Sequence, residues 1–411
     1  MSYFDFLSSF TKGGKPVSDL SRIKGLLDAL GNPEKKLRFI HIAGTNGKGS
    51  TAQMFYEILL KAGVKAGIFT SPYIIDFTDR IRFMGENISR DTLEDMLPKL
   101  KSVVKGNDYS QFEITMATAF LYYKSVGAEA IVLEAGLGGA LDSTNIITNP
   151  VLSVITSISH DHMKVLGDTL EKIALQKAGI IKRKTPCVLA YDNADEVVSV
   201  VKAAAEKQDS PLIIPQKEKL SINGDMTFGG EFLYNGKNYA ISMSGEHQIT
   251  NALNVIEGAE ILKKYYPITD QNIYDGIKSA RVIGRCEILS SSPFVILDGC
   301  HNDGGIKALA KVLKNVHEPT AIIGMLRDKN AENAILPLIP ICKKFVTVSD
   351  FNPSAYSAKE LKEIIASLGA TAQVGESVEK EYQKALSGKY KNAVILGSLY
   401  LVAKIKSIDN Q

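Results

Sequence analysis

A glycine-rich segment between a predicted strand and a predicted helix constrains this chain more than any other feature. Residues 39–43 form a short apolar run that predicts a buried strand, and residues 51–62 carry apolar side chains at helical spacing. Between them lies Gly44-Thr-Asn-Gly-Lys-Gly-Ser50. Glycines let backbone N–H groups converge on an anion, and a helix N-terminus adds partial positive charge. This context predicts a phosphate-binding loop in which Lys48 contacts the outer phosphates.

The loop differs from the common GxxxxGK[ST] pattern. The first glycine of that pattern would fall on Ile42, and Gly49 stands where a Ser or Thr hydroxyl ordinarily binds magnesium. The alternative is an ordinary glycine turn between strand and helix. Three glycines around a lysine and two hydroxyls, in a strand–helix context, favour nucleotide binding.

The length and composition limit the classes of protein to which this chain can belong. At 411 residues the chain is long enough for two or three domains, each with its own core. Its net charge of +3 is too small to indicate nucleic-acid binding. No apolar run approaches the ~20 residues that span a bilayer, and we expect no secretory signal. The scattered cysteines lack CxxC spacing, which predicts free thiols in a reducing cytoplasm and no zinc site: Cys187, Cys286, Cys300 and Cys342.

Strand and helix patterns alternate along most of the chain, which predicts an α/β fold. Residues 212–245 instead alternate short apolar and polar residues between turn signals, and this predicts an antiparallel insertion. From residue 286 the alternation restarts, so we expect a second parallel sheet. Strands are predicted at 39–43, 65–70, 130–133, 151–158, 187–190, 294–297, 320–324, 344–348 and 393–396, and helices at 51–62, 92–105, 112–126, 171–177, 197–206, 305–313, 331–339 and 357–368.

The predicted architecture therefore has two domains. Residues 1–285 form an ATP-binding domain with a P-loop-type, mostly parallel sheet and a small antiparallel β insertion. Residues 286–411 form a smaller, Rossmann-like α/β domain, with the joint near residues 283–290.

Charged and metal-binding residue types follow the predicted strands, where ligands bind in open α/β sheets. Glu134 precedes a glycine run after strand 130–133, as expected either for a carboxylate that binds magnesium or for an incidental surface acid. Arg80 and Arg82 are either solvated charges or an anion-binding surface. His160-Asp-His162 ends strand 151–158, although such a cluster is more often hydrogen-bonded structure than a ligand set.

Taken together, the segments resemble the folylpolyglutamate synthase and dihydrofolate synthase family of the Mur ligase superfamily. The resemblance runs from Ile40 to about Ala403, and the order and spacing of the motifs make it specific. The motifs are Gly44 to Ser50, Thr70-Ser-Pro72, Arg80-Ile-Arg82, Phe112-Glu113, Glu134-Ala-Gly-Leu-Gly-Gly139, Leu141-Asp-Ser-Thr-Asn145, Asp161-His-Met163, Leu166-Gly-Asp-Thr169, Lys177-Ala-Gly-Ile180, His247 to Asn251, Gly284-Arg285, Asp298-Gly-Cys-His-Asn302 and Gly397-Ser-Leu-Tyr400.

The resemblance implies a role for each matching residue. The ATP phosphates would be held by Gly44, Thr45, Asn46, Gly47, Lys48, Gly49 and Ser50. One magnesium would be held by Ser71 and Glu134, and a second by Glu134 and His162. Lys177 matches a lysine that the family carries as a carbamate. The remaining matches are Gln248 and Asn251 (adenine), Arg285 (phosphate), Asp298 and His301 (ribose and phosphate), and Arg80, Phe112 and Asp142 (the pterin-bearing substrate and its surroundings).

The implied reaction belongs to folate biosynthesis and one-carbon metabolism. ATP would phosphorylate a carboxylate to an acyl phosphate, which the amine of L-glutamate attacks with loss of phosphate. The catalytic residues Lys48, Lys177, Arg285 and His301, with two magnesium ions, would offset the negative charge that develops. Domain closure about residue 285 is expected to exclude water from the acyl phosphate.

Some positions depart from the family pattern. Tyr73 stands where His is frequent, Ala140 where Arg is usual, Gln176 where Glu is common and Cys300 where Ala is usual. Ala140 removes one expected anion contact near the substrate.

Three functions remain open at this point. The first is a cytoplasmic, monomeric folate ligase acting on dihydropteroate, on reduced folate, or on both, without nucleic-acid or membrane partners. The second is a peptidoglycan-type ligase acting on UDP-MurNAc compounds, against which Gly49 and the Ser-Pro and Phe-Glu segments argue. The third is a non-catalytic nucleotide-binding module.

Overall fold

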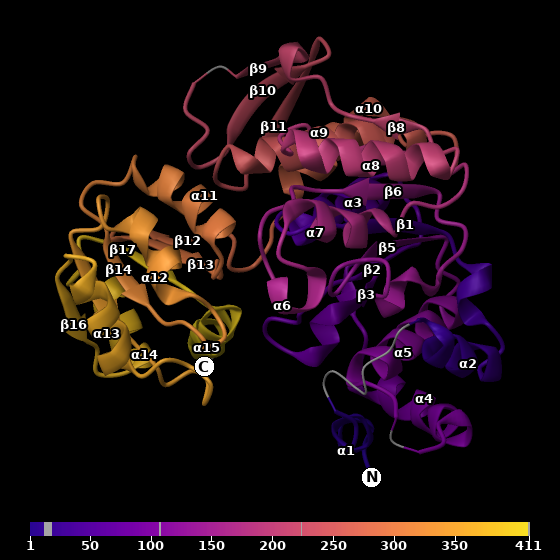
Figure 1. Ribbon diagram of the computed structural model, residues 1–411, viewed down its shortest axis with the longest axis horizontal. Coiled ribbons are helices and arrows are strands. Elements are labelled where there is room, and N and C mark those ends of the chain that lie inside the picture. Colours follow the sequence, from indigo (N-terminus) through magenta and orange to yellow (C-terminus); the bar gives the residue numbers. More distant parts are fainter. Residues whose placement is uncertain (12–18, 107, 223, 410–411) are drawn as a thin grey trace. The chain divides into compact units, whose positions relative to one another are not determined.

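The computed structural model describes residues 1–11, 19–106, 108–222 and 224–409, which divide into two compact units (Figure 1). Unit 1 comprises residues 1–221, 233–239 and 250–280, and unit 2 comprises residues 222–232, 240–249 and 281–411. The boundary after residue 285 stays a prediction. The compact division instead assigns three segments before that position to unit 2: residues 222–232, 240–249 and 281–285.

Unit 1 is built on an eight-stranded sheet with the order β4-β3-β2-β5-β1-β6-β7-β8. Strand β1 lies between β5 and β6 and is parallel to both, with Ile40 opposite Val132 and Leu152. All five residues of β1 are buried, as expected for a parallel strand covered on both faces. The strands are β1 (Phe39–Ala43), β2 (Ala66–Phe69), β3 (Ile81–Phe83), β4 (Glu86–Asn87), β5 (Ala130–Glu134), β6 (Leu152–Ile155), β7 (Cys187–Leu189) and β8 (Leu212–Ile213).

The edges of this sheet differ from the prediction. Strands β3 and β4 add an antiparallel edge beside β2, in a segment for which no strand was predicted. The antiparallel insertion was predicted to begin at residue 212, and this was wrong: β8 pairs parallel to β7. The physical reason is the preceding helix α8 (Asp195–Lys207), a crossover connection that returns the chain parallel to β7.

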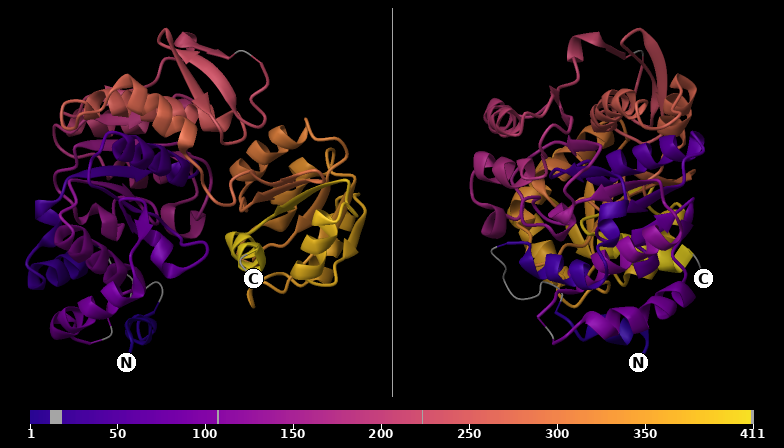
Figure 2. Two further views of the ribbon diagram at one scale, coloured as in Figure 1. Left: turned by 180° about the vertical axis from the view of Figure 1, so that it is seen from behind. Right: turned by 90° about the vertical axis from the view of Figure 1, so that its right-hand side faces the viewer.

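The insertion itself is a separate three-stranded sheet with the order β11-β10-β9, seen from behind and from the side in Figure 2. Asn235 and Gly236 join β10 to β11, and both have positive φ, as a two-residue hairpin turn requires. The turn predicted at this Asn-Gly pair is confirmed. The strands are β9 (Leu220–Ile222), β10 (Gly230–Tyr234) and β11 (Lys237–Ile241).

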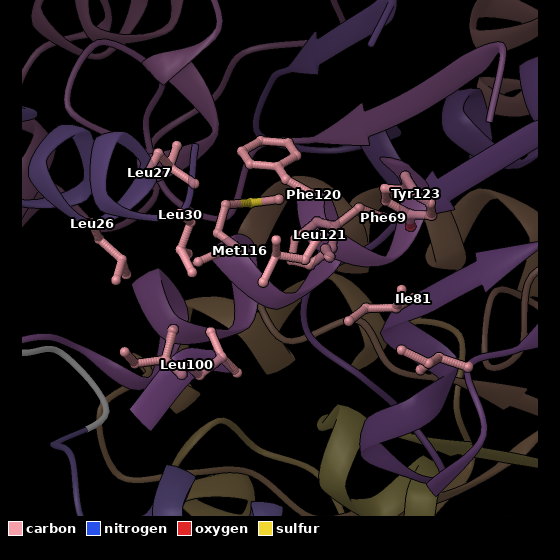
Figure 3. Packing of buried hydrophobic residues seen from close by; sticks show 14 of the residues in the cluster. Leu26, Leu27, Leu30, Phe69, Ile81, Leu100, Met116, Phe120, Leu121 and Tyr123 are labelled. Carbon is pink, nitrogen blue, oxygen red and sulfur yellow. The ribbon is translucent and has the colours of Figure 1, made fainter. Parts of the chain in front are cut away.

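Helix α5 (Gln111–Ser125) forms the centre of one core of unit 1. Ten of its residues are buried, among them the polar Glu113, Thr115 and Thr118, which confirms the prediction of a core helix. Figure 3 shows Met116 and Phe120 of α5 beside Leu27 and Leu30 at the end of α2 (Ser21–Ala29). The other helices of the unit 1 segments are α1 (Tyr3–Ser8), α3 (Lys48–Lys61), α4 (Arg90–Val103), α6 (Met163–Leu166), α7 (Leu170–Ala178), α9 (His247–Leu262), α10 (Asp270–Ser279) and the 3-10 helices η1 (Pro33–Lys36), η2 (Phe77–Arg80), η3 (Ser143–Ile146) and η4 (Lys217–Lys219).

The C-terminal part of unit 2 forms a six-stranded sheet with the order β12-β13-β17-β14-β15-β16. The prediction of a purely parallel second sheet was wrong at one edge, where β12 runs antiparallel to β13 after a short turn. The other pairs are parallel. The strands are β12 (Glu287–Ser291), β13 (Phe294–Asp298), β14 (Thr320–Ile323), β15 (Lys344–Thr347), β16 (Ala372–Val374) and β17 (Asn392–Leu396).

The helices of this sheet follow the predicted alternation with one local change. The helix predicted at 331–339 splits into α12 (Ala331–Ile335) and a 3-10 turn, η5 (Leu336–Leu338), that contains Pro337. Proline lacks the N–H that would continue the α-helical ladder. The others are α11 (Asp303–Leu313), α13 (Ala358–Ser367), α14 (Val378–Leu386) and α15 (Leu399–Asp409). Among all described residues, no helix is long and apolar enough to cross a membrane.

Candidate active site

The predicted phosphate loop lies between the end of β1 and the start of α3, and two of its glycines are sterically required. A Cβ on Gly44 would lie 1.8 Å from Thr156 Oγ1, and one on Gly47 would lie 2.2 Å from Asn251 Oδ1. Gly47 also has a φ of +88°, which favours glycine. The helix begins at Lys48, three residues earlier than predicted. Asn251, a predicted adenine contact, therefore lies against the loop.

The loop amides divide into two groups. The N–H groups of Thr45 and Asn46 donate to the Ser157 carbonyl at 2.8 and 3.3 Å, so they anchor the loop to the chain after β6. The expectation that Thr45 and Asn46 bind phosphate stays a prediction. The first turn of α3, from Lys48 to Ser50, has N–H groups that lack an intrahelical acceptor. These N–H groups are the better candidates for an anion.

Two lysines converge on one carbonyl of the loop. Lys48 Nζ donates to the carbonyls of Gly44 and Thr45 at 3.1 and 3.2 Å. Lys177 Nζ, which comes from α7, donates to the same Gly44 carbonyl at 2.7 Å. Burial, together with a smaller effect of the Lys48 charge, lowers the pKa of Lys177 to about 7. A substantial fraction of Lys177 is therefore a neutral amine near pH 7.

Glu134 ends β5 beside the phosphate loop. Its Oε2 accepts the Ser71 N–H at 3.1 Å and lies 3.8 Å from where a Cβ on Gly49 would stand. The side chain is only 5% exposed. A carboxylate and a serine hydroxyl are hard oxygen donors of the kind that Mg²⁺ prefers. The residues present at Glu134 and Ser71 therefore fit one magnesium ion beside the phosphates.

His162 fits magnesium less well. It has a left-handed backbone, its side chain is 45% exposed, and Nε2 lies 3.8 Å from Asp161 Oδ2. Imidazole nitrogen is not a donor that Mg²⁺ favours. In the described ranges, no group of three or more His, Cys, Asp or Glu residues is arranged to hold a metal. The second metal site at Glu134 and His162 therefore stays a prediction.

Arg80 and Arg82 have different surroundings. The Arg80 guanidinium lies 5.3, 5.8 and 6.0 Å from the ring centroids of Tyr73, Phe77 and Phe112, and its buried Nε has no hydrogen-bond partner among the described residues. Burial lowers its pKa. Arg82 instead donates to Gln53 Oε1 at 2.6 Å. The buried Nε of Arg82 likewise has no hydrogen-bond partner among the described residues, so the difference is that the Arg82 guanidinium is bonded to Gln53 whereas the Arg80 guanidinium lies among aromatic rings.

Phe112 and Asp142 lie on either side of Gly136, in the segment after β5. A Cβ on Gly136 would lie 2.8 Å from Phe112 Cζ and 3.2 Å from Asp142 Oδ2. Asp142 Oδ2 accepts the Leu137 N–H at 2.7 Å. Burial raises the pKa of Asp142, while these hydrogen bonds act against that shift. The structure thus brings together two residues that the resemblance assigned to the pterin compound.

One residue near this site was missed from the sequence. His41 was counted within an apolar strand, yet its imidazole is fully buried in β1 and Nε2 lies 2.9 Å from Thr144 Oγ1. Burial lowers the pKa of His41 to about 3, so the ring is neutral at physiological pH. A histidine inside an otherwise apolar strand was the signal that could have singled it out.

Three of the predicted nucleotide residues lie at or beside the end of β13: Arg285, Asp298 and His301. Asp298 Oδ1 accepts the Cys300 N–H at 2.7 Å, and Oδ2 accepts the Cys286 N–H at 2.7 Å. His301 Nδ1 lies 3.1 Å from the Gly299 carbonyl. Arg285 is half-buried and Gln248 is buried. The Asp298 carboxylate therefore closes a turn of its own unit, and its predicted contact with ribose stays untested.

A cavity of 230 Å³ in unit 1 is separate from these residues. It includes Leu37 and Phe39, at the start of β1, whereas the phosphate loop follows the other end of that strand. The cavity is not a nucleotide site by position. Its other lining residues are Lys24, Leu27, Asp28, Asn32, Glu34, Lys35, Ile146, Ile147, Thr148 and Asn149.

Family models match both parts of the chain. Residues 42–258 match the Mur ligase middle domain, and residues 284–398 match the Mur ligase glutamate ligase domain. A dihydrofolate synthase/folylpolyglutamate synthase of Bacillus subtilis is 37% identical over 96% of this chain and 95% of its own length. A folylpolyglutamate synthase of Lacticaseibacillus casei is 32% identical over 98% of this chain and 96% of its own length.

Solved structures agree with these matches. Mycobacterium tuberculosis folylpolyglutamate synthase complexed with ADP and AMPPCP superposes with a TM-score of 0.87 at 26% identity, covering 96% of each chain. Escherichia coli FolC in complex with DHPP and ADP superposes with a TM-score of 0.88 at 26% identity, covering 100% of this chain and 98% of that chain. The predicted fold class is confirmed.

Proposed function

Because the chain belongs to the folylpolyglutamate and dihydrofolate synthases of the Mur ligase family, which are ATP-dependent ligases, we propose that it joins L-glutamate to a pterin-bearing carboxylic acid. The acceptor is dihydropteroate, a reduced folate, or both. We further propose that the protein works as a monomer in the cytoplasm.

One observation carries the proposal: a buried carboxylate and two lysines surround a single phosphate loop. Glu134 Oε2 lies 3.8 Å from the Cβ position of Gly49, and Lys48 and Lys177 both donate to the Gly44 carbonyl. An ordinary structural turn does not need two lysine side chains on one carbonyl. A loop that binds a polyphosphate beside a metal does need cations and a carboxylate.

The chemistry follows from the weakness of a carboxylate as an electrophile. The substrate carboxylate attacks the γ-phosphorus of ATP, the bond to the β–γ bridging oxygen breaks, and an acyl phosphate and ADP result. The amine of glutamate then adds to the acyl carbon, loses a proton, and expels inorganic phosphate. Lys48 and the N–H groups of the first turn of α3 hold the phosphates, and Arg80 offers its guanidinium to the carboxylate or acyl phosphate.

Magnesium held by Glu134 and Ser71 would neutralise phosphate charge when bound. We propose His162 as a contributor to a second magnesium. Gln248 and Asn251 are the proposed adenine contacts, and Arg285, Asp298 and His301 are the proposed ribose and phosphate contacts.

We propose that Lys177 is carbamylated. Only a neutral amine adds to carbon dioxide, and the product loses a proton to become an anion. The Lys177 pKa of about 7 supports this step, because an ordinary lysine is almost wholly protonated at neutral pH. Lys177→Ala should lose activity and recover part of it with added small carboxylic acids. A folded Lys177→Ala protein that no such acid rescues would contradict the carbamate.

The proposed function is tested by phosphate release. Purified protein with ATP, magnesium and glutamate should release phosphate only when dihydropteroate or tetrahydrofolate is added. Lys48→Ala should abolish the release, while Lys61→Ala, at the exposed far end of the same helix α3, should not. ATP binding without release with either acid would indicate a nucleotide-binding module, and turnover of a UDP-MurNAc compound would indicate a peptidoglycan-type ligase.

A further inference from the structure

We propose that His41 is a positioning residue for the pterin site, acting through the Thr144 hydroxyl to hold the Asp142 carboxylate in place. His41 lies in β1 and Thr144 lies in η3, so the contact joins the central strand to the segment that carries Asp142. The inference rests on the proposed function, because Asp142 is a proposed contact of the pterin compound.

The hydrogen bonds form a chain with a defined direction. Thr144 Oγ1 lies 2.6 Å from Asp142 Oδ1, and the Thr144 N–H also donates to Oδ1 at 3.0 Å. An ionised carboxylate only accepts, so the single hydroxyl proton of Thr144 points to Asp142. Its oxygen then accepts from His41 Nε2 at 2.9 Å. His41 is therefore the Nε2–H tautomer.

The second ring nitrogen of His41 indicates that the histidine is present for its bond to Thr144 and not for packing alone. His41 Nδ1 is buried and has no hydrogen-bond partner among the described residues. A buried acceptor without a donor destabilises the fold, and an apolar side chain like those of Ile40 and Ile42 would avoid that cost. Within the described part of the chain, the Nε2–H bond to Thr144 is a hydrogen bond that the apolar neighbours of His41 could not make.

The chain ends where a flat ligand is expected. Thr144 holds Oδ1 of Asp142, and the Leu137 N–H holds Oδ2 at 2.7 Å on the side of Gly136 and Phe112. With both oxygens held, the carboxylate plane has one orientation beside the Phe112 ring. A pterin carries ring N–H and amino groups that donate to such a carboxylate. Hydrogen bonds in series also polarise one another, which strengthens the bond to Asp142.

Steady-state kinetics separate this role from a structural one. Thr144→Val removes the hydroxyl at nearly constant volume, and we expect the KM for tetrahydrofolate or dihydropteroate to rise roughly tenfold. The KM for glutamate should stay at the wild-type value, and Thr144→Ser should restore the pterin KM. His41→Leu, which removes the Nε2–H donor, should raise the pterin KM in the same way. A Thr144→Val protein with both KM values raised equally, or neither, would overturn the proposal.

A double-mutant cycle tests whether the effect passes through Asp142. In an Asp142→Asn background, Thr144→Val should cause no further rise in the pterin KM, because the group it positions has already changed. A full additional tenfold rise would overturn the proposal. The outcomes also distinguish failure of the proposed function from failure of the proposed role of His41. A wild-type protein without pterin-dependent phosphate release contradicts the proposed function, whereas an active wild type whose Thr144→Val variant keeps its pterin KM contradicts this inference alone.

Nitrogen-15 NMR of the histidine side chains gives a readout that needs no catalysis. His41 should appear as a neutral imidazole protonated at Nε2 throughout the range from about pH 5 to pH 8. Its resonance is assigned by its absence in His41→Gln. A proton on Nδ1, or a titration within that range, would overturn the proposal even in an enzyme with normal activity.

Discussion

Two acids that end buried strands, Glu134 on β5 and Asp298 on β13, have similar sequence surroundings and different environments. Each is followed within two residues by glycine, and each is 5% exposed. Glu134 Oε2 accepts the N–H of Ser71, from the neighbouring strand end, and lies beside the phosphate loop. Asp298 accepts two N–H groups from within twelve residues of its own position.

The difference is a matter of reach. Aspartate is one methylene shorter than glutamate, so its carboxylate stays near the local backbone and closes turns there. Glutamate reaches across to adjacent segments, where a ligand can share it. The sequence therefore shows that an acidic side chain lies at the end of a strand. Its length and its hydrogen-bond partners determine whether it stabilises a local turn or is available to a ligand.

The largest expected effects come from neutralising each acid. Glu134→Gln should lower the rate of glutamate-dependent phosphate release by roughly 10²–10³-fold and leave the stability of the fold near that of the wild type. Asp298→Asn should instead lower the free energy of unfolding by about 1–3 kcal/mol, since buried N–H groups lose a charged acceptor. Denaturant unfolding and phosphate release, measured on both variants, show which substitution lowers activity and which lowers stability. The comparison fails if Asp298→Asn is as stable as the wild type.

Two glycines of the phosphate loop beside Glu134 should also differ, one affecting stability and the other affecting activity. Gly44→Ala should destabilise the protein by about 2–4 kcal/mol, because its Cβ would clash with Thr156, which lies in the chain after β6. Gly49→Ala should fold normally, since its Cβ meets only Glu134 oxygens at 3.8 and 3.9 Å, yet lose activity because the methyl group occupies space beside the carboxylate that we propose binds magnesium. Thermal unfolding with a parallel activity assay checks both. An active Gly49→Ala enzyme would argue against metal binding at Glu134.

The low pKa of Lys177 predicts that the stability of unit 1 depends on pH. Its pKa is about 7 in the folded chain against 10.5 as the ordinary value, so the unfolded chain binds more protons between these pH values. The free energy of unfolding should therefore rise with pH from about 7 to about 10.5, with a slope of at most ~1.4 kcal/mol per pH unit from this group. Lys177→Met should flatten that slope, as urea unfolding at several pH values would reveal. An unchanged slope would contradict the depressed pKa.

The last comparison takes one histidine from each unit, whose effect appears only at acidic pH. Burial lowers the pKa of His41 to about 3 and that of His247 to about 4. Both groups bind fewer protons when folded, so stability should fall as the pH drops below about 6.5, down to about 4 for His247 and about 3 for His41. His247→Gln should reduce the loss of stability at acidic pH only above about pH 4. His41→Gln should reduce that loss of stability down to about pH 3. Identical acid profiles for the two variants would contradict the ordering.

The central strands and the loop were predictable because their patterns are local. An apolar run predicted β1 at residues 39–43, and the structure has the same bounds. The antiparallel edges β3, β4 and β12 were not predicted, since edge strands are short and lack the continuous apolar run of a parallel strand. The predicted site residues Lys48, Lys177 and Glu134 meet around one loop because parallel strands end at the same sheet edge.

The sequence by itself determined the alternation of strands and helices, the glycine loop and the chemical types of the site residues, because periodicity and spacing are properties of neighbours along the chain. Only the tertiary structure decided that Lys177 lies 2.7 Å from the Gly44 carbonyl, that Asp298 is held by Cys286 and Cys300, and that His41 contacts Thr144. Burial and hydrogen-bond direction set the pKa and the role of these groups, and both depend on residues that are distant in sequence.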